Sequence, residues 1–548
     1  MSINQNVAGS AKSTADGAQW DRLFRFLNNG TQRQKEHDWS YLELDVWPIV
    51  KAQVLMRASN IYNAGRPMHV KGAPSNDSPR GFSLQRLFGL KSRPKYQASD
   101  FLDGFEWPDI TEYLAEDTVL CLGYSTNHKK IGSTYFQLCM DPLRAALALN
   151  GYHTTGFITG FPAHDEAVQN AAVKDLTSIE RQFRDVRRLA KKLPPLDLDD
   201  LPGFSAWWAD IHRMMGDDIF ITKEHIEGVI KETAICAFWF FSQFKRRRPK
   251  AVVVSAYYGL AGHGASWACR RLGIPIADVQ HGVAGVRHHA YSWPNAPERG
   301  FNTLPTAFFC WSENEVRELQ TGSGKWRPGL LQIGNVWRLL DQTILTGTAP
   351  GIYKEGGIEA AHQALCEETA AIERIKQSIG GEVDILIALH PGEQIDWFDE
   401  LRAHAPKTWR FWIRLHPGEL KSRSALEERL AEVSGPRTFV IEPSTSSLST
   451  ILKEVDVVAT KYSSVVLDAY AFGVQSIAYS EAAARHFFGA SWDDKLIYVN
   501  PTAKDIETAI SACLSARAGV STPEVKPLNV LGQEIAACLS LNGVGRLT

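Results

Sequence analysis

The stretch from Ala251 to Asn335 constrains the fold most, because it begins with a complete β-α-β pattern. Lys250–Tyr257 is short, apolar and β-branched, which is typical of a buried parallel strand. Ala261–Leu272 then has helical spacing, and Ile274–Gln280 is a second apolar strand. The pattern predicts an open α/β sheet, in which ligands bind at the carboxyl edge of the strands.

The second strand of this unit delivers Gln280, His281 and Gly282 to that edge. An imidazole with a pKa near ~6.5 can accept a proton at neutral pH, so His281 is a candidate general base. A hydrogen-bonded loop histidine is the alternative for the same pattern. Three more residues follow closely and are expected to line an acceptor site or assist proton transfer: His288, His289 and Tyr291.

Composition narrows the class of protein. At 548 residues the chain should hold two or more domains, and a net charge of −2 gives no sign of nucleic-acid binding. None of the eight cysteines forms a CxxC pair, which favours a reducing, cytosolic compartment without structural zinc. Met1–Gln19 lacks the apolar region of a signal peptide, and the most apolar run, Ala234–Phe241, is too short to span a bilayer. We expect a soluble or peripheral protein.

Residues 1–115 are expected to form an N-terminal extension with a disordered start, helices within Trp20–Tyr62 and a basic loop over Arg66–Ser99. That loop either contacts acidic lipid or is simply solvated. The basic run Lys245–Arg248 also has two interpretations. Its cations either stabilise the C-terminus of a helix through the helix dipole or form a membrane-surface patch.

The first α/β series begins at Thr118–Tyr124, a buried strand pattern. A polar loop over 125–133, a helix over 134–150 and a strand over 152–159 are predicted to follow. Asn127 and His128 lie just past the first strand, where a sheet meets its ligand, although a loop without function would have the same composition.

A second α/β series follows a Thr/Gly/Pro-rich connection. The predicted strands are Val383–Leu389, Thr408–Leu415, Thr438–Ile441, Val455–Thr460 and Gln475–Tyr479. We therefore expect an acceptor domain over 116–342, a linker and helix over 343–380, and a nucleotide-donor domain over 381–548. Two such series predict two Rossmann-like domains facing a central cleft.

Two constellations in the second series could hold phosphate. In the first, Pro417 forces the chain out of the sheet after Arg414 and His416, and Glu419 follows. A related His-Pro-Gly-Glu string starts at His390, and we favour His416 because an arginine precedes it.

The second constellation places hydroxyls and a cation where a strand meets a helix, which suits an anion, although plain helix capping would look the same. Its candidate residues are Thr460, Lys461, Ser463, Ser464 and Asp468.

The order of these motifs resembles that of GT-B glycosyltransferases of bacterial surface polysaccharide synthesis. The chain has strand-Gln-His-Gly, then Arg-x-His-Pro, then Thr-x-x-Ser-Ser-x-x-x-Asp. It is similar to the CDP-glycerol and CDP-ribitol polymerases and to the CMP-sialic acid and Kdo-type transferases. The resemblance covers about residues 118–520 and departs from the polymerases at Gln280, where they usually have Trp.

The resemblance implies a role for each matched residue. His281 would be the general base, His416 would contact the donor phosphates, and Ser463 and Ser464 would bind phosphate. Asp468 would hold ribose or orient the site. No metal or other cofactor is implied.

It also implies an activity: transfer of a sugar from a nucleotide donor, CMP- or CDP-linked, to a hydroxyl of a surface glycan or lipid-linked glycan, with inversion. The alternatives are a polyol-phosphate transferase, a UDP-sugar epimerase and a catalytically silent glycan-binding protein. We expect a cytoplasmic enzyme, with peripheral contact at the inner membrane as a further possibility. The oligomeric state is open.

Overall fold

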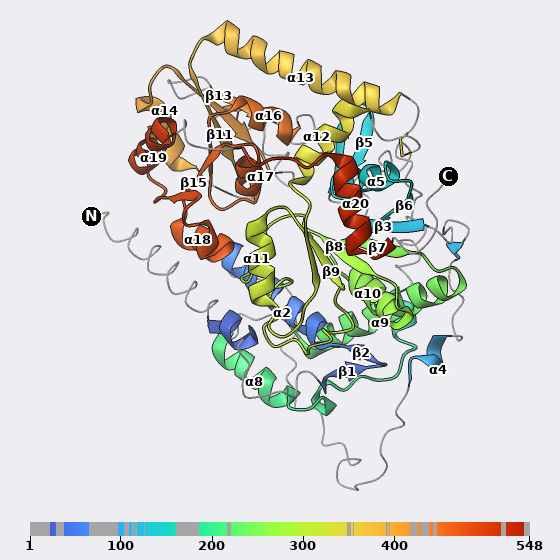
Figure 1. Cartoon of the computed structure of the whole chain (residues 1–548). Helices are drawn as coiled ribbons and strands as arrows, with labels where there is room; N and C mark the ends of the chain where they lie inside the picture. The colour runs from blue at the N-terminus through green and yellow to red at the C-terminus, as the bar shows by residue number, and fades with distance from the viewer. Residues whose placement is uncertain are drawn as a thin grey trace.

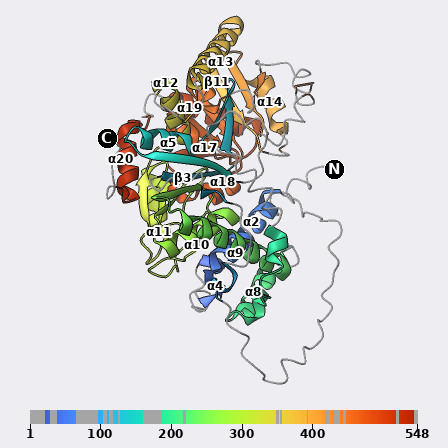
Figure 2. The same ribbon diagram turned by 90° about the vertical axis from the view of Figure 1, so that its right-hand side faces the viewer.

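A computed structural model of the chain describes residues 22–28, 38–64, 97–102, 109–111, 114, 118–124, 127–159, 186–215, 221–347, 352–353, 356–390, 393, 395–416, 424, 427–428, 438–441, 447–516 and 522–541. Within these ranges the chain forms two six-stranded parallel sheets, each flanked by helices (Figure 1). The turned view separates the two domains vertically, with the N-terminal extension below (Figure 2). The predicted pair of Rossmann-like domains is confirmed.

The first sheet has the strand order β10-β9-β8-β7-β3-β6. Its strands are β3 (Thr118–Tyr124), β6 (His153–Thr159), β7 (Ala251–Ser255), β8 (Ile276–Val279), β9 (Ala307–Cys310) and β10 (Gly329–Gln332). The chain moves outward from β3 to β6 and then returns to the other side of β3. The order therefore reverses between β3 and β7, and this switch point is where an open α/β sheet leaves a crevice for a ligand.

The helices of the first domain begin and end at residues suited to those positions. Thr222 accepts a hydrogen bond from the N–H of His225, and Ser312 forms a capping box with Glu315, as expected of helix starts. Gly273 ends a helix with φ 65°, which a side chain would strain. The helices are α5 (Asp141–Ala148), α9 (Lys223–Arg246), α10 (Leu260–Leu272), α11 (Glu313–Gly322) and α12 (Val336–Thr346).

The predicted loop over 125–133 and helix over 134–150 are partly wrong. A hairpin of β4 (His128–Ile131) and β5 (Thr134–Gln137) occupies part of both, and the helix begins only at Asp141. Asp141 accepts a hydrogen bond from the N–H of Gln137, and Pro142 follows in the first turn. A proline is favoured there but not in a helix interior, so the helix starts late.

The second sheet has the order β13-β12-β11-β14-β15-β16 and reverses between β11 and β14. Its strands are β11 (Val383–Ala388), β12 (Trp409–Arg414), β13 (Thr438–Ile441), β14 (Val457–Thr460), β15 (Gln475–Ala478) and β16 (Leu496–Tyr498). Its helices are α13 (Gly357–Ile379), α14 (Asp396–His404), α16 (Leu448–Glu454), α17 (Val465–Ala471), α18 (Glu481–Phe488) and α19 (Ala503–Ala516).

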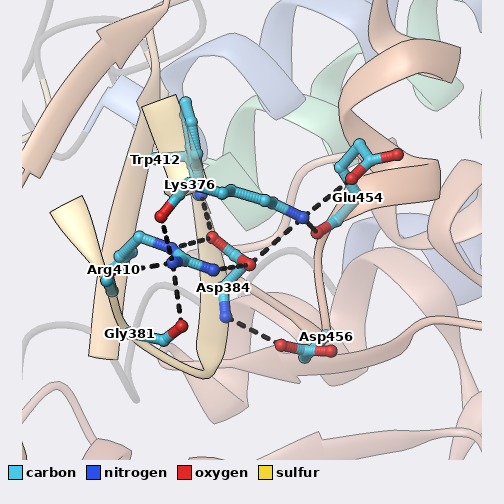
Figure 3. Close-up of polar contacts among 8 residues, drawn as sticks. Lys376, Gly381, Asp384, Arg410, Trp412, Glu454 and Asp456 are labelled. Carbon is cyan, nitrogen blue, oxygen red and sulfur yellow. Dashed lines mark hydrogen bonds and ion pairs between the residues drawn. The ribbon is translucent and has the colours of Figure 1, made fainter. Parts of the chain in front are cut away.

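A dense polar network fastens the amino edge of this sheet (Figure 3). Arg410 grips the carboxylate of Asp384 with two nitrogens, at 2.7 and 2.6 Å, and Trp412 Nε1 donates to the same carboxylate at 2.7 Å. Lys376 joins Asp384 to Glu454, at 3.2 and 2.8 Å. Each charge therefore has an opposite charge or a hydrogen-bond partner, as buried ions require.

The extension packs on the first domain, including its helix α8 (Phe204–Met215), through β1 (Ser40–Tyr41), β2 (Leu44–Asp45), α2 (Trp47–Ala64) and α4 (Ser99–Leu102). Trp39, Trp47 and Trp207 meet edge to face, with ring centroids 5.2–5.7 Å apart. Asp45 and Asn302 exchange hydrogen bonds of 2.8 and 2.7 Å with each other's backbone N–H. These contacts make the extension part of the first domain's core.

The last helix, α20 (Leu528–Cys538), runs beside α5 of the first domain (Figure 2). A side chain at Gly532 would collide with the carbonyl oxygen of Ala146, so the two helices approach closely only because of this glycine. Buried apolar residues of both domains form one continuous cluster. The boundaries placed at 343–380 stay predictions. No helix in the described ranges is long and apolar enough to cross a membrane.

Candidate active site

A strained turn marks the switch point of the first sheet. Directly after β7, Ala256 adopts φ 59°, a conformation that non-glycine residues rarely hold. The chain then turns into α10, whose Gly262 lies so close to the Tyr257 backbone that a Cβ would clash. Such strain persists only where surrounding contacts fix it, and here it brings Tyr258 to the carboxyl edge.

His281 follows β8 at the same edge and makes two hydrogen bonds. Its Nδ1 lies 3.3 Å from the Val279 carbonyl, and its Nε2 lies 2.8 Å from the Tyr258 hydroxyl. Because a carbonyl can only accept, Nδ1 carries the proton of the neutral ring and Nε2 accepts from Tyr258. Burial lowers the pKa of His281, which favours this neutral, basic form. Tyr258 was not predicted, because only the strand order shows that its turn adjoins His281.

His288 and His289 lie in the same cluster, and their predicted role at an acceptor site stays a prediction. Their rings stack with centroids 4.2 Å apart, and Tyr258 lies against both. Burial is the main reason that the pKa of His289 falls to about 3, and it lowers that of His288 as well. Tyr291 donates to the fully buried Asp278 at 2.8 Å. Burial raises the pKa of Asp278 to about 7 despite that hydrogen bond. We did not single out Asp278, which lies inside an apolar strand pattern.

The neighbours of His281 shape the loop. Gln280 is buried, its amide nitrogen donates to the Gly282 carbonyl at 2.8 Å, and its oxygen accepts from the Trp311 N–H at 2.6 Å. A Cβ at Gly282 would meet no atom within 4 Å, so the backbone there borders open space. Gln280 therefore ties β8 to β9 while Gly282 leaves the space beside His281 clear.

In the second sheet, His390 and Lys461 follow β11 and β14, the two strands that flank the switch point. The His390 ring lies against Tyr462, with ring centroids 4.1 Å apart and planes tilted by 37°, and its buried Nε2 has no hydrogen-bond partner in the described ranges. Glu393 accepts from the His390 N–H at 2.8 Å. Burial, followed by the charges of Lys461 and His416, lowers the pKa of His390 to about 4.

Lys461 is the cation at this switch point. Its ammonium lies 5.7 Å from the centre of the Tyr462 ring, and among the described side chains it forms no ion pair. His390, Lys461 and Tyr462 thus offer an unpaired nitrogen, a charge and a flat ring at one point, which suits an anionic ligand. Our preference for His416 over His390 rested on the neighbouring arginine. The strand order cannot be seen in the sequence. It places His390 directly after β11, a strand that flanks the switch point, and so favours His390 as well.

The hydroxyl residues serve the backbone in part. Thr460 donates to the Ala388 carbonyl at 2.7 Å and accepts from the Ser463 N–H, so it joins β14 to β11. The Ser463 hydroxyl accepts from the Val465 N–H at 3.4 Å, as a helix cap does. Ser464 makes no such capping bond. Only Ser464 therefore keeps its hydroxyl clear of the local capping bonds.

Arg414 and Asp468 lie at the interface between the domains. Asp468 is 5% exposed and accepts a 2.8 Å hydrogen bond from the Asn335 side chain of the first domain. Burial raises the pKa of Asp468 to about 7, although Asn335, Arg414 and Lys129 all favour its charged form. Burial likewise lowers the pKa of Arg414 to about 10, against the charges of Glu368 and Asp468. This arrangement suits a link between domains at least as well as a nucleotide contact.

Other predicted residues lie around the same interface. Asn127 precedes the hairpin that carries His128, and its buried side-chain nitrogen has no hydrogen-bond partner among described residues. Pro417 and Glu419 lie outside the described residues. The loop over residues 281–293 carries His281, His288 and His289 and is called the histidine loop below. A side chain at Gly489, directly after α18, would meet Arg287 of this loop at 3.4 Å. Since Phe487 of α18 also contacts Tyr462, at 5.8 Å, α18 bridges the two carboxyl edges.

No protein-family model and no curated protein matches the chain. Among solved structures, it is similar to the UDP-GlcNAc 2-epimerase of Neisseria meningitidis bound to UDP-GlcNAc (15% identity, 78% of this chain and 100% of that chain, TM-score 0.45). It is also similar to Staphylococcus aureus MnaA with UDP (13%, 78% and 98%, 0.44) and to the wall teichoic acid polymerase TagF (11%, 80% and 92%, 0.40). At these low identities and TM-scores, the similarities add no argument. The assignment of two domains rests on the observed strand order of the two sheets.

Proposed function

We propose that the protein is a glycosyltransferase that moves a sugar from a nucleotide-activated donor, CMP- or CDP-linked, to a hydroxyl of a surface glycan or lipid-linked glycan. The observation that carries the proposal is the unpartnered Nε2 of His390 beside Lys461 at the switch point of the second sheet. A basic histidine, His281, stands at the carboxyl edge of the first sheet, and α18 contacts both edges. A phosphate would supply the missing partner of His390 and Lys461, and an acceptor hydroxyl could lose its proton to His281.

In this proposal the second domain holds the donor phosphates. Lys461 supplies a charge, His390 a hydrogen bond through Nε2 and Ser464 a hydroxyl, while His416 and Arg414 add to the positive potential. Such groups offset the charge of the leaving phosphate as it develops. The Tyr462 ring packs against the His390 imidazole at a tilt and helps to keep it in place.

The first domain activates the acceptor. The acceptor oxygen attacks the anomeric carbon, the bond from that carbon to the phosphate oxygen breaks, and the nucleotide leaves with the electron pair. The proton passes to His281 Nε2, either directly after the Tyr258 hydroxyl moves aside or through that hydroxyl. Direct displacement inverts the anomeric carbon.

A thermal-shift panel of CMP, CDP, UDP and GDP tests donor binding, because a ligand of the native state raises the apparent melting temperature. We expect one nucleotide to stabilise the wild type and the surface variant Lys504→Met equally, and His390→Ala much less. Mass analysis of the product with the matching donor then identifies the reaction. A retained phosphate would mean polyol-phosphate transfer, and an isomerised donor without an acceptor would mean epimerisation. No nucleotide effect at all would contradict the proposal.

We further propose a cytoplasmic location with contact at the inner membrane. The run Lys245–Arg248 lies largely at the surface, although Arg247 donates to the Thr111 carbonyl and Arg248 to the Gly273 carbonyl, both at 3.0 Å. Vesicles with and without anionic lipid, pelleted with the protein, test the contact. Equal pelleting with both would contradict it.

A further inference from the structure

A buried cation of the N-terminal extension contacts the histidine loop of the first domain. Lys51 lies on α2 and is 1% exposed. Its ammonium donates to the side-chain oxygen of Asn28 at 2.6 Å and to the carbonyl of Ser292, and it lies 4.1 Å from the centre of the Trp293 ring. A buried ammonium is costly unless its hydrogen bonds and ring contacts fix it, so these contacts hold the loop firmly.

The contacts of Lys51 continue from Trp293 into the site. Trp293 Nε1 donates to the Ala290 carbonyl at 2.9 Å and to the Tyr257 hydroxyl at 3.1 Å. Tyr257 in turn donates to the Ala290 carbonyl, so the residue that follows His289 is held from two sides. Tyr257 also precedes Tyr258, the partner of His281. Lys51 is thus one tryptophan away from the backbone that places both histidines.

We propose that Lys51 is a positioning residue: its buried ammonium fixes the loop that carries His288 and His289 against Tyr258 and His281. The inference rests on the proposed function for its catalytic meaning, although the positioning itself can be measured without any substrate. The extension would then be a working part of the first domain's site, outside the region that carries the motif resemblance.

Lys51 acts on the histidines in two ways, through the contacts that hold the loop and through its positive charge. After burial, the Lys51 ammonium is the next cause of the lowered pKa of His289, followed by His281. Several other titratable groups face this cluster from the elements packed around it: Tyr257, Tyr258, Asp278, His288 and Tyr291. Of these only Asp278 can become negative near neutral pH, and its carboxylate already accepts from Tyr291 and from the Tyr257 N–H.

Histidine-labelled protein, titrated by NMR, tests the positioning directly. Lys51→Met keeps the length of the side chain and removes its charge and donors. We expect the midpoint of His289 to rise by about one pH unit, because a neighbouring cation no longer opposes protonation. The signals of His281 and His288 should shift as their rings move. Lys231→Met is the matched control, since Lys231 is also a sheltered lysine of the first domain but pairs with Glu227 on α9.

A second variant covers the case in which Lys51→Met does not fold. Asn28→Ala keeps the cation but removes one acceptor of the ammonium, which loosens its hold on the loop. The signals of His288 and His289 should therefore move as the loop shifts, by less than in Lys51→Met. Histidine titrations that stay at their wild-type positions in whichever variant folds would overturn the proposal.

Kinetics and nucleotide binding separate this proposal from the proposed function. With an active donor, Lys51→Met should lower kcat about tenfold with little change in the donor KM, and should move the acid limb of kcat/KM upward. The nucleotide that stabilises the wild type should stabilise the variant equally. If no nucleotide binds either protein but the histidine midpoint still moves, the proposed function fails and the positioning role stands.

Discussion

The two edges of the second sheet use similar side chains for opposite purposes. At the amino edge, Asp384 meets Arg410, Trp412 and Lys376, and each partner is itself held (Figure 3). At the carboxyl edge, Lys461 forms no ion pair and His390 keeps an unpartnered nitrogen, both within the described ranges. Saturated charges stabilise a fold, whereas unsatisfied ones cost stability and persist where a ligand completes them.

The first sheet repeats the carboxyl-edge pattern with a base instead of a cation. Burial lowers the pKa of the half-buried His281, which favours its neutral form, and its acceptor nitrogen lies 2.8 Å from the Tyr258 hydroxyl. The comparison therefore predicts that variants at the carboxyl edges lose function while the fold survives, and that variants at the amino edge do the reverse.

The largest effect should come from His281→Ala. Loss of a general base lowers kcat by about 10²–10⁴-fold, whereas the fold should survive because the ring's two hydrogen bonds involve only a loop carbonyl and Tyr258. Turnover with the donor identified by the thermal-shift panel measures the loss of kcat, and circular dichroism shows whether the fold survives. Wild-type turnover in the purified variant would contradict the assignment of His281.

Asp384→Ala should have the largest effect on stability. It leaves the buried guanidinium of Arg410 without its carboxylate, and breaking a buried ion pair costs about 3–5 kcal/mol. Urea unfolding gives the free energy of unfolding, and Asp494→Ala is a suitable control because Asp494 is exposed and its ion pair is with the adjacent Lys495. Nucleotide affinity should not change at temperatures where the variant is folded. A selective loss of nucleotide binding would break the contrast between the edges.

Tyr258→Phe should have a smaller effect and decides how the proton reaches His281. If the hydroxyl relays the proton, kcat falls about tenfold or more, with no change in the nucleotide's thermal shift. If the hydroxyl only occupies Nε2 until the acceptor arrives, kcat stays at or above the wild-type value. Either result sharpens the account, whereas loss of the nucleotide's thermal shift would show that Tyr258 acts on the donor side.

Acidification should weaken the two edges in different pH windows. The pKa of His390 is lowered to about 4 in the folded state, so the stability from its neutral form is present above about pH 6.5 and is lost as pH falls toward 4. Arg410 lowers the pKa of Asp384, and that stability is lost only as pH falls below about 3.9. Urea midpoints from pH 7 to 4 should fall less in His390→Phe than in the wild type. Identical pH dependence in the two proteins would contradict this order.

Sequence patterns predicted the strands well because buried parallel strands are short, apolar and β-branched. Thr118–Tyr124 and Thr438–Ile441 match the observed strands at both ends. The hairpin at 128–137 was missed, since its polar first strand has the composition of a loop.

The candidate site was harder to predict than the fold. Local pattern alone picked out His281, Lys461 and a pair of His-Pro strings as positions that follow a strand, with His416 preferred over His390. Which of them adjoin depends on the strand order, and this is set by packing over long sequence separations. Tyr258 and Lys51 therefore emerged only from the structure, as did the contact of Asp468 with Asn335 across the domains.

Calorimetric titration of the stabilising nucleotide into wild type, Lys461→Met and Lys504→Met tests the central claim most directly. Lys504 is exposed on α19 of the same domain, so its variant makes the same chemical change away from the carboxyl edge. The account predicts equal dissociation constants for wild type and Lys504→Met and a value about 10- to 100-fold weaker for Lys461→Met, as expected for a lost hydrogen bond to a charged phosphate. Equal binding by all three proteins would contradict it.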